Sequence, residues 1–184
     1  MVQQVFAYKM ILFGNEAVGK TSLVERFVNE KFEEAYHATL GYNVYEKQLP
    51  FLNFTVSLII YDIGGQEKFR PLRKKYAEGA NTAFIVYDIT DRKSFDSISE
   101  WKSDLSEFAG NSPFFIIGNK LDLQAKRQVS TMEALKLSSI LGAVNFFEGS
   151  AKTGEGVEDI FKLLAIKTYE YYVLGTETGT PTFL

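Results

Sequence analysis

The sequence predicts one α/β domain with a six-stranded, mostly parallel sheet, one antiparallel edge strand and about five helices on the two faces of the sheet. Short apolar runs alternate with amphipathic helical patterns along the chain, which is typical of parallel strands joined by helical crossovers. Only residues 50–53 separate the second apolar run from the third. We therefore expect these two strands to form an antiparallel hairpin at one edge.

The expected strands, in chain order, are residues 5–13, 42–49, 54–61, 82–88, 113–118 and 144–148. A helix should follow the first strand at about residues 22–30. Residues 94–108 should form another, because apolar side chains recur there at spacings of three and four and share one face. These side chains are Phe95, Ile98, Trp101, Leu105 and Phe108. A capping box of Ser130 and Glu133 begins a later helix, and the last helix should end near Tyr172.

A length of 184 residues, with 46% hydrophobic and 23% charged residues, indicates a single globular domain with a full core. We assign residues 1–174 to this domain. Residues 175–184 are rich in threonine and glycine and contain Pro181, so we expect a flexible tail there.

Composition excludes several classes of protein. A net charge of -3 argues against a nucleic-acid partner. With no cysteine, there is no disulfide, thiol nucleophile, cysteine-based zinc site or attachment point for a prenyl or palmitoyl chain. No apolar run approaches the roughly 20 residues of a membrane helix. We expect a cytoplasmic monomer, and this sequence itself offers no site for a lipid anchor.

The first candidate site is Gly14 to Thr21, which lies between the first strand and the first helix and fits the P-loop pattern G-x-x-x-x-G-K-T. In such a loop, backbone amides and the helix N-terminus surround a phosphate, lysine adds a positive charge and the hydroxyl binds Mg²⁺. The alternative is a coincidental glycine turn. The candidate phosphate-binding residues are Gly14, Glu16, Ala17, Val18, Gly19, Lys20, Thr21 and Ser22.

The second candidate site is the run Asp62 to Glu67, DIGGQE, which ends the third strand. Ligands of open α/β sheets bind at the carboxyl ends of strands, so Asp62 can hold, through water, the Mg²⁺ that Thr21 contacts. Gly65 allows a backbone N–H to approach a γ-phosphate, and Gln66 can orient an attacking water. An aspartate at a strand end can also be purely structural.

The third candidate site is the run Asn119 to Asp122, NKLD, directly after another buried strand. A carboxylate at Asp122 can accept hydrogen bonds from N1–H and the exocyclic amine of guanine, whereas adenine would leave it unpaired. Asn119 is expected to brace neighbouring loops, and the Lys120 stem can lie along the base. The alternative is a polar loop that closes a strand.

The ordered set of Gly14 to Thr21, Thr39, Asp62 to Glu67, Asn119 to Asp122 and Ser150 to Lys152 resembles the Ras superfamily of small GTPases, from about Val5 to Tyr172. The run from Tyr87 to Asp91, followed by Ser94, Phe95 and Trp101, is most similar to the Rab branch. The resemblance implies the small G-protein form of the P-loop NTPase fold, with GTP or GDP and Mg²⁺ as ligands.

The resemblance also implies roles at matching positions. Thr39 would be the switch I threonine that binds Mg²⁺ and the γ-phosphate, which adds it to Thr21 and Asp62 as a metal ligand. Phe32 would pack against guanine and Tyr36 would close over the phosphates, although the residues alone make both of them buried loop anchors. Around the base, Ser150 belongs to the motif, Ala151 would donate its N–H to guanine O6, and Lys152 would lie beside the base. Residues 63–78 would form switch II.

The function implied is a GTP-hydrolysing molecular switch with Gln66, Lys20, Thr39 and Gly65 in catalytic roles. Its GTP state orders the switch loops for effectors. No arginine of the sequence is aimed at the site, so we expect slow turnover without a GTPase-activating protein. An exchange factor would be the other regulator.

Glu16 departs from the family, in which a glycine or another small residue is usual. A carboxylate there would lie near the γ-phosphate and predicts slow hydrolysis, unless it points to solvent.

Two rival functions remain: a module that binds GTP or GDP without hydrolysis, and another P-loop enzyme such as an ATP-dependent kinase, which Asp122 disfavours. His37 is interpreted as a solvated loop residue. The side chains of Arg70, Arg73, Lys74 and Lys75 form either a basic partner-binding face or a solvated helix surface.

Overall fold

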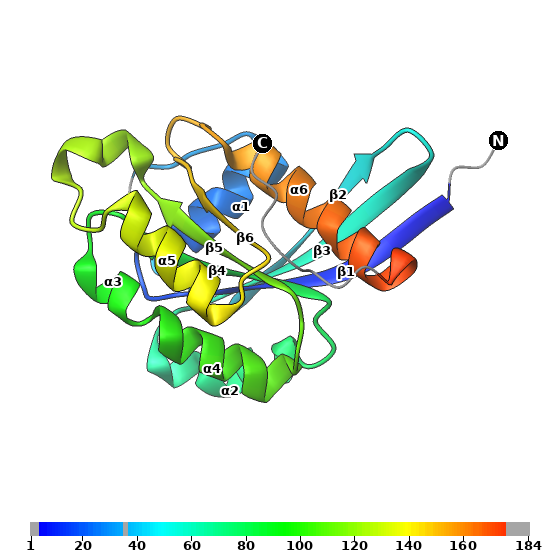
Figure 1. Cartoon of the computed structure of the whole chain (residues 1–184), viewed down its shortest axis with the longest axis horizontal. Helices are drawn as coiled ribbons and strands as arrows, with labels where there is room; N and C mark the ends of the chain where they lie inside the picture. The colour runs from blue at the N-terminus through cyan, green and yellow to red at the C-terminus, as the bar shows by residue number, and fades with distance from the viewer. Residues whose placement is uncertain (1–3, 35–36, 176–184) are drawn as a thin grey trace.

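Six strands form one sheet in the order β2-β3-β1-β4-β5-β6 (Figure 1). The computed structural model describes residues 4–34 and 37–175. The strands are β1 Gln4–Phe13, β2 Tyr42–Pro50, β3 Phe54–Ile63, β4 Thr82–Asp88, β5 Phe114–Asn119 and β6 Asn145–Glu148. Only β2 runs antiparallel to its neighbour, β3, and every other pair is parallel. The predicted sheet and its antiparallel edge strand are confirmed.

Helices cover both faces of this sheet (Figure 1). They are α1 Lys20–Asn29, α2 Arg70–Ala77, α3 Arg92–Asp96, α4 Ile98–Ala109, α5 Thr131–Leu141 and α6 Val157–Tyr169. Side chains of α1 and α6 pack in the core on one face, while α2, α3, α4 and α5 pack in the core on the other. Short 3₁₀ helices at Glu67–Phe69 and Leu121–Lys126 precede α2 and α5.

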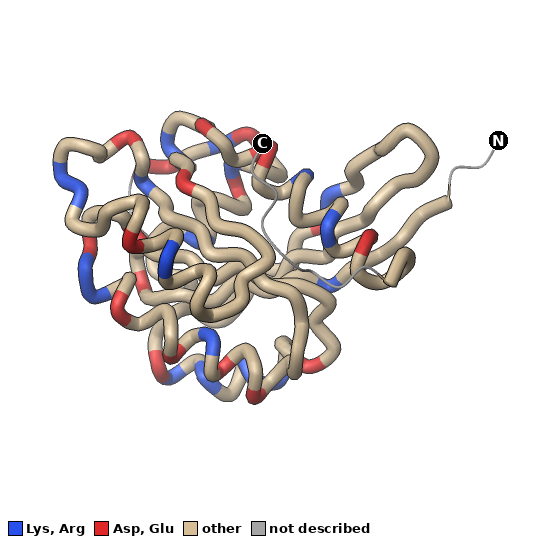
Figure 2. The backbone as a smooth tube through the Cα atoms, viewed as in Figure 1, with Lys and Arg blue, Asp and Glu red and all other residues tan. Residues whose placement is uncertain are grey.

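The apolar runs of the sequence are explained by burial on both sides of the sheet. All residues of β4 and β5 are buried, as expected for parallel strands with helices on either face. Lysine, arginine, aspartate and glutamate lie mainly on the helices and loops around them (Figure 2). No helix within the described ranges is both long and apolar enough to cross a membrane.

The helix expected at residues 94–108 is divided in two. Its five apolar side chains are buried as predicted, but a separate short helix, α3, ends at Asp96, and α4 starts at Ile98, with Ser97 between them. The Asp91 side chain caps α3 by accepting a hydrogen bond from the N–H of Lys93, and the Ser97 hydroxyl donates to the carbonyl of Lys93 at 2.9 Å. These local bonds compete with a continuous helix, so the described residues contain six α-helices where about five were expected.

The last helix also differs at its end. Its α-helical part stops at Tyr169, and a π-helical turn, Glu170–Leu174, continues it past the predicted end at Tyr172. Apart from Gly175, the residues assigned to a tail lie outside the described part of the chain.

An ion pair joins the segment after β5 to β6. Arg127 donates to both carboxylate oxygens of Glu148, at 2.6 and 2.9 Å, and the two side chains are only 14% and 11% exposed. Thr131, the first residue of α5, donates to the same carboxylate at 2.9 Å. Glu148 therefore holds together β6, the segment after β5 and the start of α5.

We predict that Glu148→Gln lowers the free energy of unfolding by about 2 kcal/mol, because it leaves the Arg127 charge mostly buried without its counter-charge. Urea unfolding followed by far-ultraviolet circular dichroism measures the change. Glu158→Gln is the matched control, since it breaks an exposed pair with Lys162 and should leave stability unchanged. Equal effects of the two variants would contradict the prediction.

Candidate functional site

The loop from Gly14 to Gly19 connects β1 to α1 and has a backbone that glycine makes possible. Gly14 and Gly19 have φ values of 138° and 93°, which side chains rarely adopt. A Cβ atom at Gly14 would collide with the carbonyl of Val86, and one at Gly19 would collide with the amide of Asn119. Both glycines are therefore required by close packing as well as by conformation.

Lys20 begins α1 and turns back under this loop. Its Nζ donates to the carbonyl oxygens of Gly14 and Asn15 at 2.7 and 2.8 Å, and the residue is only 6% exposed. Burial lowers the pKa of Lys20 to about 8, and the nearby Asp62 carboxylate opposes that shift. The Lys20 side chain beneath the loop therefore loses its charge near pH 8, well below the usual pH for lysine.

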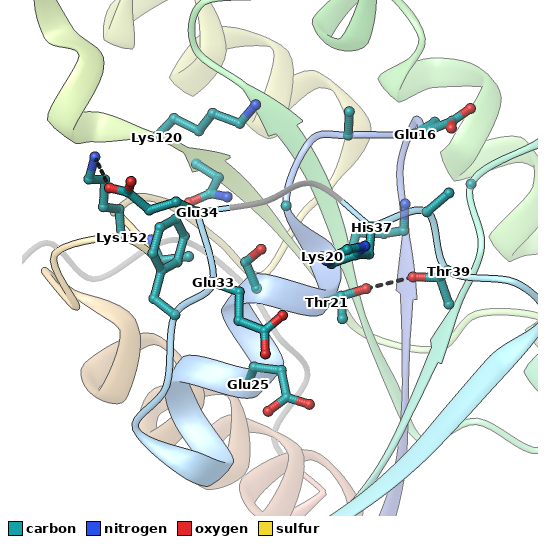
Figure 3. Close-up of a pocket in the computed structure, with 18 of the residues that line it drawn as sticks. Glu16, Lys20, Thr21, Glu25, Glu33, Glu34, His37, Thr39, Lys120 and Lys152 are labelled. Carbon is teal, nitrogen blue, oxygen red and sulfur yellow. Dashed lines mark hydrogen bonds and ion pairs between the residues drawn. The ribbon is translucent and has the colours of Figure 1, made fainter.

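Three side-chain oxygens meet beside Lys20, and Figure 3 shows two of them, those of Thr21 and Thr39. Thr21 Oγ1 donates to Asp62 Oδ2 at 2.6 Å and lies 2.7 Å from Thr39 Oγ1. Thr21 belongs to α1, Asp62 to the end of β3 and Thr39 to the loop before β2. Residues of three different segments are therefore collected at one point.

This oxygen cluster fits the Mg²⁺ that the family resemblance implies. Asp62 is fully buried, its Oδ1 has no hydrogen-bond partner among the described residues, and burial raises the pKa of Asp62, against the effects of Thr21 and Lys20. A cation beside the cluster would offset the cost of that buried carboxylate. Hydroxyl and carboxylate oxygens suit Mg²⁺, which uses one or two carboxylates and keeps several waters. No group of three or more histidine, cysteine or acidic residues suited to a metal occurs in the described ranges.

Gly65 and Gln66 follow β3 and lie against the P-loop. A Cβ atom on Gly65 would come within 2.6 Å of the Gly14 oxygen and 2.7 Å of the Glu16 nitrogen, so this close approach needs glycine. Gln66 Nε2 donates to Glu16 Oε1 at 2.8 Å. The glutamine that was predicted to orient water is thus held by the glutamate that departs from the family pattern.

The loop before β2 and the loop after β3 are joined directly. The backbone N–H of Gly64 donates to the carbonyl of Gly41 at 3.0 Å. A Cβ atom on Gly64 would also come within 2.6 Å of the Thr39 carbonyl oxygen. Displacement of either loop must therefore disturb the other.

At the opposite end of the cavity, Asn119 joins two loops. Its Nδ2 donates to the Val18 carbonyl at 2.9 Å, and its Oδ1 accepts from the N–H of Ala151 at 3.1 Å. That N–H, which the resemblance assigned to guanine O6, already has an acceptor within the protein. Ser150 is fully buried, and its hydroxyl fixes the Asp122 carboxylate at 2.5 Å.

The two lysines expected beside a base are engaged in ion pairs. Lys120 Nζ lies 2.7 Å from Asp88 Oδ2, so its ammonium group is held by the end of β4. Lys152 Nζ lies 3.1 Å from Glu34 Oε1 in the loop after α1 (Figure 3). This second pair links the Ser150 to Lys152 loop to the segment that leads to Thr39.

These groups surround one cavity of about 590 Å³. The predicted site residues that line it are Glu16, Ala17, Gly19, Lys20, Thr21, Ser22, Phe32, Thr39, Gly65, Gln66, Asn119, Lys120, Asp122, Ala151 and Lys152. Four others, Gly14, Val18, Asp62 and Ser150, are not in its lining. Tyr36 lies outside the described residues. His37 is exposed at the rim, and none of the described arginines lines the cavity.

Sequence reasoning missed Arg26 of α1, which holds the Ser150 to Lys152 loop in place. Its Nε donates to the Ala151 carbonyl at 2.8 Å and its Nη2 to the Lys152 carbonyl at 2.6 Å. It also missed Glu25, a lining residue whose Oε1 accepts from the Tyr45 hydroxyl at 2.8 Å. Both residues lie on a helix with ordinary amphipathic spacing, so no sequence signal marked them.

The basic residues of α2 do not form a free positive face. Arg70 pairs with Asp104 and Glu107 at 3.0 and 2.9 Å, and Lys74 pairs with the same Glu107 at 3.3 Å. Arg73 is 1% exposed. Most of this charge is therefore neutralised by α4 or buried beneath it.

Comparison with known proteins agrees with this arrangement. The model of the Ras family matches residues 9–170. The chain is 35% identical over 163 residues to the Ypt/Rab-type GTPase Rab7 of Neurospora crassa, covering 85% of this chain and 80% of that protein. It is 37% identical over 164 residues to the Ras-related protein Rab7 of Pisum sativum, with the same coverage. It is 40% identical over 156 residues to the Ras-related protein Rab-2B of Dictyostelium discoideum, covering 84% and 77%.

The family match includes the loop from Gly14 to Gly19, the end of β3, the Asn119 to Asp122 run and the Ser150 to Lys152 loop. The relatives named here are all Rab proteins, which confirms the expected resemblance to that branch. On this match and the fold around the cavity, the chain belongs to the Ras family of small GTPases.

Proposed function

We propose that this protein is a molecular switch that binds GTP and GDP with Mg²⁺ and hydrolyses GTP to GDP. The observation that carries the proposal is a single cavity with a buried lysine and the P-loop at one end and the anchored Asp122 carboxylate at the other. A nucleotide needs both ends, because its phosphates are anionic and its base presents hydrogen-bonding edges.

Guanine selectivity is assigned to Asp122. Its carboxylate can accept the N1–H and exocyclic amine of guanine, and the Ser150 hydroxyl fixes its orientation at 2.5 Å. Adenine has an acceptor at N1 and would face this carboxylate without a donor. Since the Ala151 N–H is already bonded to Asn119, Asp122 supplies most of the discrimination.

At the phosphate end, loop amides and Lys20 bind the anionic oxygens, and Thr21, Thr39 and Asp62 would hold Mg²⁺. When bound, the ion neutralises charge that develops on the phosphate oxygens. Gln66 orients the attacking water, while Lys20 and the amides stabilise the leaving oxygens. Because no described arginine lines the cavity, we infer slow turnover that an activating protein accelerates with its own arginine.

Effectors and regulators are proposed to bind where the two switch loops share a surface. Leu40, Tyr42 and Val44 are exposed there, at 81%, 43% and 49%. The ring of Tyr76 of α2 packs against the ring of Tyr42 in a tilted arrangement, with ring centroids 4.3 Å apart. The hydrogen bond between Gly64 and Gly41 lies beneath this surface, so a partner that binds it would sense both loops together.

One observation favours the alternative, a guanine-nucleotide-binding module with little hydrolysis. Gln66 can position water only if its amide group is available, and in this structure that amide donates to Glu16 at 2.8 Å. The Glu16 carboxylate would also add negative charge beside the γ-phosphate. Both effects would lower the rate of hydrolysis without preventing nucleotide binding.

We predict that the purified protein releases a guanine nucleotide when it is denatured. Anion-exchange chromatography of the supernatant identifies the base and the number of phosphates. Release of an adenine nucleotide would contradict the assignment of Asp122 and favour an ATP-dependent enzyme.

We predict that Glu16→Gly hydrolyses GTP about tenfold faster than the unaltered protein under single-turnover conditions, because it frees Gln66 and removes the carboxylate. Glu100→Gln, an exposed carboxylate on α4, is the charge-matched control and should not change the rate. Gln66→Leu gives the baseline without the water-positioning amide. The same rate for Glu16→Gly and the unaltered protein would show that Glu16 does not slow hydrolysis.

We predict that nucleotide binding is linked to protonation of Lys20. With a pKa of about 8 in the free protein, Lys20 is largely neutral at pH 8.5, and bound phosphates should restore its charge. GDP binding should then take up about 0.7 of a proton at pH 8.5 and less at pH 7.5, where Lys20 is already mostly charged, and affinity should fall as pH rises above 8. Calorimetry in buffers of different ionisation enthalpy measures this uptake. Lys20→Arg, which stays charged, should abolish it, and equal uptake by both proteins would refute the prediction.

A further inference from the structure

Arg73 of α2 is a charged side chain that the mechanism above does not use. It is 1% exposed and is the largest of the fully buried side chains. Its neighbours Lys74 and Lys75 are exposed on the same helix. Arg73 alone of these three is directed into the protein, beneath the segment that carries Gly65 and Gln66.

The guanidinium group binds the backbone of that segment. Its Nη1 donates to the carbonyl of Gln66 at 2.8 Å and to the carbonyl of Gly64 at 3.2 Å. Its Nη2 donates to the Glu67 carboxylate at 3.3 Å. One side chain therefore holds the residues before and after Gly65, the residue that touches the P-loop.

The same group is connected to the P-loop from the other side. Its central carbon lies 4.8 Å from the ring of Trp101 on α4, within the range of a cation–π contact. Trp101 Nε1 donates to Asn15 Oδ1 at 2.6 Å. A continuous path runs from the P-loop through Trp101 and Arg73 to the backbone of Gln66.

Burial of the Arg73 charge is unfavourable for the stability of the folded state. Burial lowers the pKa of Arg73, its Nε has no hydrogen-bond partner among the described residues, and the Glu67 carboxylate is 80% exposed. A pair with so exposed a partner gives little stability, and an apolar side chain often replaces a buried charge without loss. Stability alone does not account for an arginine here.

We propose that Arg73 is a positioning residue for GTP hydrolysis, which it serves by holding the backbone of Gln66 against the P-loop. The inference rests on the proposed function, since Gln66 must orient water for its position to matter. Glu16 holds the side chain of Gln66, and Arg73 holds its carbonyl group. A fixed backbone limits the positions that the Gln66 amide can reach, and errors of about 1 Å at such a group can cost a hundredfold in rate.

The test compares Arg73→Met, which replaces the apolar part of the arginine side chain but removes every donor, with Lys74→Met on the exposed side of the same helix. We expect Arg73→Met to lower the single-turnover hydrolysis rate about tenfold, with GDP affinity within threefold of the unaltered protein. Lys74→Met should change neither quantity. In the Gln66→Leu background, Arg73→Met should cause no further loss, because the group that it positions is absent.

A merely structural role would lower the rate equally in both backgrounds, and that result would overturn the proposal. An unchanged rate in Arg73→Met would overturn it as well. Should Arg73→Met fail to fold, Arg73→Lys replaces it, because lysine keeps the charge but cannot bind two carbonyls as a fork.

Hydrogen exchange of the amides at residues 64–67 in the GDP-bound protein separates this inference from the proposed function. Faster exchange in Arg73→Met than in Lys74→Met supports the positioning role, and equal exchange overturns it, whether or not the protein hydrolyses GTP. If the unaltered protein binds GTP without hydrolysis, the proposed hydrolytic function fails while the exchange result still decides the role of Arg73.

Discussion

The parallel pairing of β3, β1, β4 and β5 is the constraint on which the rest of the structure depends. Parallel strands end at the same edge of a sheet, so the pairing of Leu12 with Asp62 and of Asp88 with Asn119 places the ends of all four strands side by side. Chain segments far apart in sequence thereby contribute to one cavity. The polar residues at these ends, Asp62, Asp88 and Asn119, are buried, and neighbouring segments supply most of their hydrogen bonds.

Those hydrogen bonds make the loops depend on one another. Asn119 bonds to the P-loop and to Ala151, Thr21 bonds to Asp62, and Gly64 bonds to Gly41. Most of these groups are buried, where an unmade hydrogen bond costs about 1 to 3 kcal/mol. The loops are therefore held in one mutual arrangement by polar contacts, whereas the apolar cores on the two faces of the sheet fix only the strands and helices beneath them.

The sheet and its antiparallel edge could be predicted from the sequence, because apolar periodicity is a local signal. Motif spacing predicted the P-loop and the Asn119 to Asp122 run of the cavity, whereas Phe32, Thr39, Ala151 and Lys152 were expected only from the family resemblance. The break at Ser97 could not, since Asp91 and Ser97 form hydrogen bonds that leave the apolar spacing unchanged. The partners of Glu16 and Arg26 could not be predicted either, because they lie 50 and 125 residues away in sequence, and Arg73 binds mainly backbone carbonyls. Backbone acceptors have no side-chain identity, so an arginine that binds them resembles any exposed arginine in the sequence.

The position of Arg26 has a consequence for how a ligand would leave the cavity. Helix α1 begins with Lys20 and Thr21 at the P-loop end of the cavity, and less than two turns later Arg26 holds the carbonyl groups of Ala151 and Lys152 at the other end. One rigid helix thus grips the two ends of the cavity. A regulator that tilts α1 would loosen both ends in a single movement, so release would be one concerted opening and not two successive ones.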